Sequence, residues 1–174
     1  MKNKILSRWF GGEHPASQHT TQPGLRPGLS VLVVDDSRTQ LFGIEKLLKA
    51  EGVKTYTAEN GKQGILMARH VKPDLILMDI VMPEINGFQA TRYLTRQPDT
   101  GHIPIIIISG TDQQSDRLWG LKLGAKDYMQ KPVKRELLLA KIAYWTSQQA
   151  QIKPVVRNGK EASTDSAPLL GEAI

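Results

Sequence analysis

The strongest constraint on the fold is a regular alternation of short strand-like runs with longer amphipathic segments between residues 30 and 149. Several runs are almost continuously apolar and rich in Val, Ile and Leu, which is typical of strands buried on both faces of a sheet. The predicted strands are residues 30–34, 53–58, 75–78, 105–108 and 127–130. The predicted helices are residues 37–51, 61–71, 86–96, 113–123 and 134–149. Strands that alternate with helices imply right-handed parallel βαβ units, with helices on both faces of one sheet.

Local signals support these boundaries. Ser37 is suited to cap the first helix, and Pro73 follows the second helix and stops it. The inward face of the last helix is predicted to hold Leu137, Leu138, Ile142 and Trp145. Residues 1–28 are rich in Gly, Pro, His, Ser and Thr, and residues 150–174 are again polar, so we predict a flexible N-terminal extension and a disordered C-terminal tail.

The composition excludes several classes of protein. The chain has no cysteine, which excludes disulfide frameworks, thiolate zinc sites and cysteine nucleophiles. No apolar run approaches the ~20 residues of a membrane span and no secretory signal is visible, so we expect a cytoplasmic protein without an integral membrane segment. The formal net charge of +6 is scattered among acids, and residues 150–174 lack the pattern of a helix-turn-helix, so no DNA partner is expected.

Polar residues follow the predicted strands at the points where they end. Asp35 and Asp36 follow the first strand, Asp79 the third, Ser109 the fourth and Lys131 the fifth. Each residue alone is explained equally well as a helix cap, a turn residue or a solvated side chain. Together they fall at one edge of the sheet, because the carboxyl ends of parallel strands lie on the same side, where such folds hold their sites.

The chemistry of this group favours an anion and a hard cation. Three carboxylates brought together repel one another and raise the pKa of at least one of them, unless a cation intervenes. No His or Cys stands beside them, so the expected cation is one that prefers oxygen ligands, with Mg²⁺ the best match. A hydroxyl and a lysine supply donors for the oxygens of an anion. The set is suited to phosphoryl transfer onto a carboxylate.

These motifs resemble a known family. Val31-Leu-Val-Val-Asp35-Asp36-Ser37, Leu75-Ile-Leu-Met-Asp79-Ile-Val-Met-Pro83 followed by Asn86-Gly87, Ile105-Ile-Ile-Ile-Ser109-Gly110 and Lys131-Pro132 resemble the receiver domain of two-component response regulators, the CheY-like family. The resemblance covers residues 29–149. It implies an α/β, (βα)5 flavodoxin-like fold, a doubly wound five-stranded parallel sheet with strand order 2-1-3-4-5.

The resemblance also implies a role for each site residue. Asp79 would be the phosphoacceptor, attacking the phosphorus of a phosphohistidine donor, and Lys131 and Ser109 would contact the phosphoryl oxygens. The Mg²⁺ ligands would be Asp35, Asp36, Asp79 and the backbone carbonyl of Val81.

The output of a receiver is a conformational switch. Ser109 and Tyr128 would form this switch, with Tyr128 rotating inward when the phosphoryl group draws Ser109 toward it. Val81 and Thr111 stand at variable positions of the family pattern, so the rate of dephosphorylation is not predicted. The implied partners are a histidine kinase or its phosphotransfer domain and an effector protein that binds the face of residues 113–149, with the chain itself a monomer or weak dimer.

A finer resemblance concerns the pathway. Residues 78–92, together with Trp119-Gly120 and the segment 124–128, look like the stand-alone receivers of twitching-motility (type IV pilus) chemosensory systems. The function expected is therefore a single-domain response regulator, and not an enzyme beyond its self-catalysed phosphorylation and slow autodephosphorylation. A phosphorelay intermediate or phosphate sink without its own effector remains an alternative. A phosphatase is disfavoured because Val81 stands where its second acid is needed, and a flavin module because no Gly-rich phosphate loop follows the first strand.

Overall fold

Five parallel strands form one sheet, in the order β2-β1-β3-β4-β5. The computed structural model describes residues 25–110 and 114–152. The strands are β1 (Ser30–Val34), β2 (Lys54–Ala58), β3 (Leu75–Asp79), β4 (Ile105–Ser109) and β5 (Asp127–Gln130). The helices are α1 (Arg38–Ala50), α2 (Gly61–Val71), α3 (Gly87–Arg96), α4 (Gln114–Lys122) and α5 (Arg135–Ile152). The predicted fold class and strand order are confirmed.

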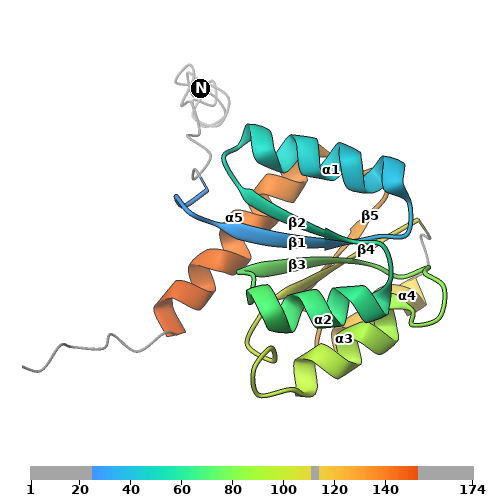
Figure 1. Ribbon diagram of the computed structural model, residues 1–174. Coiled ribbons are helices and arrows are strands. Elements are labelled where there is room, and N and C mark those ends of the chain that lie inside the picture. Colours follow the sequence, from blue (N-terminus) through green and yellow to red (C-terminus); the bar gives the residue numbers. More distant parts are fainter. Residues whose placement is uncertain (1–24, 111–113, 153–174) are drawn as a thin grey trace, which may run out of the picture.

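The sheet lies between two layers of helices (Figure 1). On one face, apolar side chains of β1, β3 and β4 pack against α1 and α5, including Leu48 and Ile142. On the other face, alternate residues of the same strands pack against α2 and α3, including Ala68 and Leu94. Residues of β3 and β4 are buried throughout, which explains why these two strands read as continuous apolar runs.

Side-chain caps fix where three of the helices begin. The side chain of Ser37 accepts a hydrogen bond from the backbone of Gln40, and Asn60 caps α2 in the same way. Asn86 and Gln89 form a reciprocal capping box at the start of α3. Each cap follows a strand directly or after a short loop, so the three helices begin at the edge of the sheet where the strands end.

The predicted elements agree with the structure to within three residues at every described end. Helix α5 continues to Ile152, three residues beyond the predicted end, whereas the predicted start of the fourth helix at Gln113 lies outside the described residues. One predicted core residue is wrong: Leu137 is 47% exposed, whereas its neighbour Leu138 is fully buried. One residue turns a helix by about 100°, so the inward face begins at Leu138.

The amino edge of the sheet carries a small polar network. Asp74 accepts hydrogen bonds from the backbone and the hydroxyl of Ser30, and it pairs with Arg26. Leu25 packs against the core beside it. Residues 1–24 and 153–174 lie outside the described part, so the predicted extension and tail remain predictions. Among the helices that the structure describes, none has the length and apolar character needed to cross a membrane.

Candidate functional site

Three carboxylates meet at the carboxyl edge of the sheet. Asp35 and Asp36 follow β1, and Asp79 ends β3, the neighbouring strand. One oxygen from each carboxylate lies within 4.8 Å of the others. Asp35 and Asp79 are only 2% and 4% exposed, whereas Asp36 is exposed to solvent. We call these three residues the carboxylate cluster; it lies where the sequence predicts it.

Lys131 links two members of the carboxylate cluster. Its Nζ atom donates to Oδ1 of Asp79 at 2.6 Å and to Oδ2 of Asp35 at 2.7 Å. The second oxygen of Asp35 accepts from the backbone of Ser37 at 2.9 Å. One ammonium group therefore neutralises part of the charge of three carboxylates, and the cluster retains excess negative charge.

The pKa values reflect this crowding. Burial raises the pKa of the Asp79 carboxyl above its ordinary value, the neighbouring charges of Asp35 and Asp36 raise it further, and Lys131 only partly opposes them. Burial by itself lowers the pKa of Lys131, but its hydrogen bonds to Asp35 and Asp79 outweigh burial and hold the pKa above its ordinary value. The cluster therefore favours any further positive charge placed beside Asp79.

The remaining predicted site residues lie at the end of the adjacent strand or just beyond Asp79 in the chain. Ser109 is buried at the end of β4, and its carbonyl accepts from the backbone of Lys131 at 2.7 Å. Val81 lies two residues beyond Asp79, and its side chain is 66% exposed. The Lys131–Pro132 peptide is cis. Thr111 lies outside the described residues.

Gly87 is a structural requirement that the sequence analysis did not identify. The backbone of Gly87 donates to the carbonyl of Ile80 at 3.0 Å, which brings the start of α3 against the end of β3. A Cβ atom at this position would lie 1.9 Å from the backbone oxygen of Asp79. The Asn86-Gly87 pair in the sequence is the visible signal, because a glycine allows the backbone approach that any side chain would prevent.

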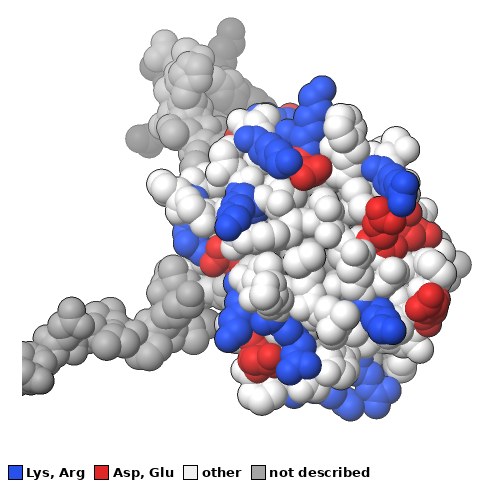
Figure 2. Space-filling view, in the orientation of Figure 1, with Lys and Arg blue, Asp and Glu red and all other residues white. Residues whose placement is uncertain are grey.

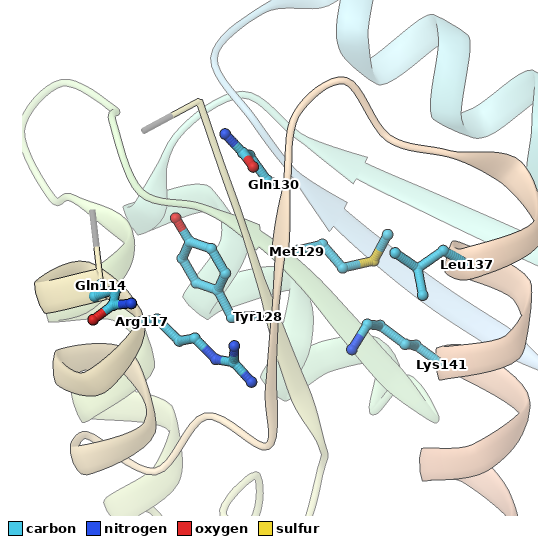
Figure 3. A pocket seen from close by; sticks show the side chains of 7 residues that line it. All are labelled: Gln114, Arg117, Tyr128, Met129, Gln130, Leu137 and Lys141. Carbon is cyan, nitrogen blue, oxygen red and sulfur yellow. The ribbon is translucent and has the colours of Figure 1, made fainter. Parts of the chain in front are cut away.

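Tyr128 lies beside a cavity between α4 and α5. This cavity of about 400 Å³ is lined by Gln114, Arg117, Tyr128, Met129, Gln130, Leu137 and Lys141. Tyr128 lies on the α4 side of β5 and its hydroxyl points toward the same end of the strand as Gln130, whereas Met129 points toward α5 (Figure 3). The predicted switch residue therefore lies on β5, the strand that Lys131 directly follows.

The donor set of the carboxylate cluster fits Mg²⁺. Its oxygens converge, two of the three carboxylates are buried, and only one cation within the described chain is hydrogen-bonded to them. Mg²⁺ is bound by one or two carboxylates together with waters and phosphate oxygens, so an open, oxygen-only site at the sheet edge is suitable for it. Because Asp36 is exposed, an ion can reach the carboxylate cluster from solvent.

Comparisons with known proteins agree with this geometry. Residues 31–143 match the family described as "Response regulator receiver domain". The chain is 49% identical over 112 residues to Protein PilH of Pseudomonas aeruginosa, which covers 64% of this chain and 93% of PilH.

Solved structures show the same likeness. The receiver domain of the sensor histidine kinase PA1611 from Pseudomonas aeruginosa PAO1, which has a magnesium ion coordinated in its active site cleft, is 32% identical with a TM-score of 0.65, covering 69% of this chain and 98% of that one. The chemotaxis protein CheY4 of Vibrio cholerae is 26% identical with a TM-score of 0.63, covering 66% and 96%. Receivers accept phosphoryl groups on an aspartate as a family, and the resemblance read from the sequence is confirmed. With its order of strands, its carboxylate cluster and its match over residues 31–143, this chain belongs to the response regulator receiver domain family.

Proposed function

We propose that this protein is a single-domain response regulator that accepts a phosphoryl group on Asp79 and thereby changes its contacts with other proteins. The observation that carries the proposal is the bridge from Lys131 to Asp79 and Asp35 inside the carboxylate cluster. A lysine held 2.6 Å from the acceptor carboxylate is already in place to pair with an oxygen of an incoming phosphoryl group.

The transfer needs a nucleophile and neutralised charge. A carboxylate oxygen of Asp79 attacks phosphorus while the P–N bond of a phosphohistidine breaks and its electron pair returns to the imidazole nitrogen. Lys131 then exchanges its contact with Asp79 for one with a phosphoryl oxygen, and the hydroxyl of Ser109 donates to another. Because the transition state is loose, the protein contributes mainly position and charge.

Mg²⁺ would be held by Asp36, Asp79, the carbonyl of Val81 and, partly through water, Asp35. Bound there, the ion neutralises charge that builds up on the phosphoryl oxygens. The chain itself performs no reaction beyond its own phosphorylation and slow autodephosphorylation, so it acts as a signalling protein rather than as an enzyme with a separate substrate.

The signal would leave through the face of residues 113–149. Ser109 and Tyr128 would transmit it, because drawing Ser109 toward the phosphoryl group frees space beside β5 for the ring of Tyr128. The cavity between α4 and α5 would change shape as that ring turns, since Tyr128 is one of its walls (Figure 3). A ligand or partner that prefers one shape would then shift the population.

The pathway we propose is a chemosensory system of the twitching-motility type, in the cytoplasm. The resemblance of residues 78–92 to the receivers of such systems and the 49% identity to PilH support this assignment. The kinase or phosphotransfer domain that would supply the phosphoryl group and the effector that would respond are both proteins of that system.

The test is phosphorylation by acetyl phosphate, measured by intact mass. We expect one added phosphoryl group in the presence of Mg²⁺, removable by hydroxylamine as an acyl phosphate should be. Asp79→Asn and omission of Mg²⁺ should each abolish it, whereas Asp99→Asn, which changes a surface acid outside the carboxylate cluster, should leave it intact. An adduct that persists in Asp79→Asn would contradict the proposal.

Rapid hydrolysis could hide an adduct, so a second measurement is needed. Beryllofluoride, a stable mimic of the phosphoryl group, should change the fluorescence of Trp119 on the exposed side of α4, and it should do so only with Mg²⁺ and Asp79 present. If folded protein gives neither an adduct nor a beryllofluoride response, Asp79 is not a phosphoacceptor in this chain.

A further inference from the structure

The outer face of α3 carries a small cavity with two arginines that form no ion pair within the described residues. Gln89, Arg92, Tyr93, Arg96 and Gln97 line this space of about 290 Å³. It lies on the helix layer opposite to α5. Positively charged side chains lie over α3 along the lower edge of the molecule in Figure 2. We call these five residues the α3 cavity.

The charge of the α3 cavity has no counterpart in the described chain. Arg92 and Arg96 are one helical turn apart and both exposed, and α3 contains no acidic residue. Neither arginine forms an ion pair within residues 25–110 and 114–152. By contrast, Arg69 on the adjacent α2 pairs with Asp99 at 3.1 Å, which raises its pKa. Like charges four residues apart destabilise a helix, so the pair favours an acidic occupant.

The described chain ends close to this helix. The side chain of Gln149, near the end of α5, donates to the backbone oxygen of His102 in the connection between α3 and β4. His102 follows Arg96, the last residue of α3, by six positions. Helices α3 and α5 lie on opposite faces of the sheet but end at the same edge of it, so the chain that follows Ile152 starts at the edge where α3 ends (Figure 1).

The chain beyond α5 contains a segment of the opposite charge. Residues 161–174 hold Glu161, Asp165 and Glu172 and no lysine or arginine. Glu161 and Asp165 have the same four-residue spacing as the two arginines. The intervening residues 153–160 can extend to about 26 Å from the edge of the sheet at which α3 ends, and α3 itself is ~15 Å long.

We propose that residues 161–174 dock on the α3 cavity of the same molecule, with Glu161 and Asp165 paired to Arg92 and Arg96. Exposed ion pairs are individually weak, so the docked state is a minor and salt-sensitive population, which the millimolar effective concentration of a tethered segment raises. The docking does not depend on chemistry at Asp79 and can be tested in unphosphorylated protein.

A single spin label tests the contact. Because the chain has no cysteine, Ser166→Cys gives one attachment site for a nitroxide inside the acidic segment. In full-length protein at low ionic strength, the label should broaden the amide NMR signals of residues 89–97. Reversing charge with Glu161→Lys and Asp165→Lys should lower that broadening by about tenfold, as expected for the loss of two ion pairs.

Matched controls separate this contact from general electrostatics. Lys46→Glu with Lys62→Glu removes the same number of exposed cations from α1 and α2, and it should leave the broadening unchanged. Arg92→Glu with Arg96→Glu should abolish it, and combining this pair with Glu161→Arg and Asp165→Arg should restore it. Amide exchange of the sheet verifies that each variant is folded.

Three results would overturn the proposal. Broadening that is unchanged by the charge reversals would exclude pairing of the acidic segment with the arginines. Broadening confined to residues 114–149 would place the segment on the other cavity. Broadening of isotope-labelled protein by a separate spin-labelled molecule, to the same extent as within one chain, would assign the α3 cavity to a second copy.

Discussion

The close contact between α3 and β3 makes Gly87→Ala an informative perturbation. The added Cβ atom would meet the backbone oxygen of Asp79 at 1.9 Å, its carbonyl carbon at 2.8 Å and the Cα of Ile80 at 3.0 Å. All three are backbone atoms, so no side-chain rotation relieves the overlap. An ordinary contact begins near 3.4 Å, so the start of α3 and the end of β3 must separate by about 1.5 Å.

The expected cost has two parts, one in stability and one in reactivity. Overpacking of this kind destabilises by about 1–3 kcal/mol, and the better helix propensity of alanine offsets less than about 1 kcal/mol of it. Each kcal/mol should lower the melting temperature by about 4 °C. Because the displaced backbone carries Asp79, and a shift of ~1 Å in a reacting group costs about 100-fold in rate, phosphorylation by acetyl phosphate should slow by about that factor.

Gly43→Ala is the matched control. Gly43 lies within α1, and apart from the neighbouring residues and backbone of its own helix a Cβ atom there would meet no described atom within 4 Å. This variant should stabilise the protein by about 0.5–1 kcal/mol and leave phosphorylation unchanged, because alanine is the better helix former. Urea unfolding and the time course of the mass adduct measure both quantities. If Gly87→Ala behaves like Gly43→Ala in both, the backbone approach at Asp79 is not a constraint and the reasoning is refuted.

Three further outcomes are expected. Thr91→Val should raise the free energy of unfolding in urea by about 1 kcal/mol, because the Thr91 hydroxyl is fully buried and has no hydrogen-bond partner within the described residues; a loss would mean that the hydroxyl is satisfied. Burial alone would raise the pKa of Asp127, but hydrogen bonds from Lys141 and other donors lower the pKa overall. The Asp127 carboxylate therefore stabilises the fold fully at pH values above the ordinary Asp pKa of about 4, and this stabilisation is lost as the pH falls through the lowered pKa of the folded state. The stability gap to Asp127→Asn should therefore be constant above about pH 5 and shrink below it, and a gap that is unchanged down to pH 2 would contradict the shift. Lys131→Met should lower the free energy of unfolding by about 3 kcal/mol in EDTA, because it leaves the carboxylate cluster without its cation. Added Mg²⁺ should then restore more stability in this variant than in the parent, and an equal effect of Mg²⁺ on both proteins would mean that the cluster does not bind the ion.

Much of the fold was readable from the sequence for a definite physical reason. Strands that are buried on both faces must be apolar throughout, so the continuous apolar runs predict β3 and β4 directly. The capping residues Ser37 and Asn86 predict where two of the helices begin. The buried face of a helix is harder to predict from the sequence when two leucines are consecutive. Leu137 and Leu138 are chemically alike, and only the packing of α5 on the sheet decides which of them is buried.

The site divides in the same way. Parallel strands bring their ends to one edge, so the convergence of Asp35, Asp79 and Lys131 followed from the order of elements alone. The bridging contact of Lys131 could not be predicted, because it depends on how β5 is aligned with β4. Nor could the difference between buried Asp35 and exposed Asp36, since both are adjacent acids after the same strand.

The arrangement of the chain ends gives the molecule a reactive side and a tethering side. The described chain begins at Leu25 and ends at Ile152. Both ends lie at the amino edge of the sheet, as the contacts of Arg26 with Asp74 and of Gln149 with His102 indicate. A strand of five residues separates that edge from Asp79 by about 17 Å. A tag, a surface or a fused domain attached directly at Leu25 or Ile152 would therefore be anchored on the side away from the acceptor carboxylate, and an immobilised molecule would still present that carboxylate to a phosphodonor in solution.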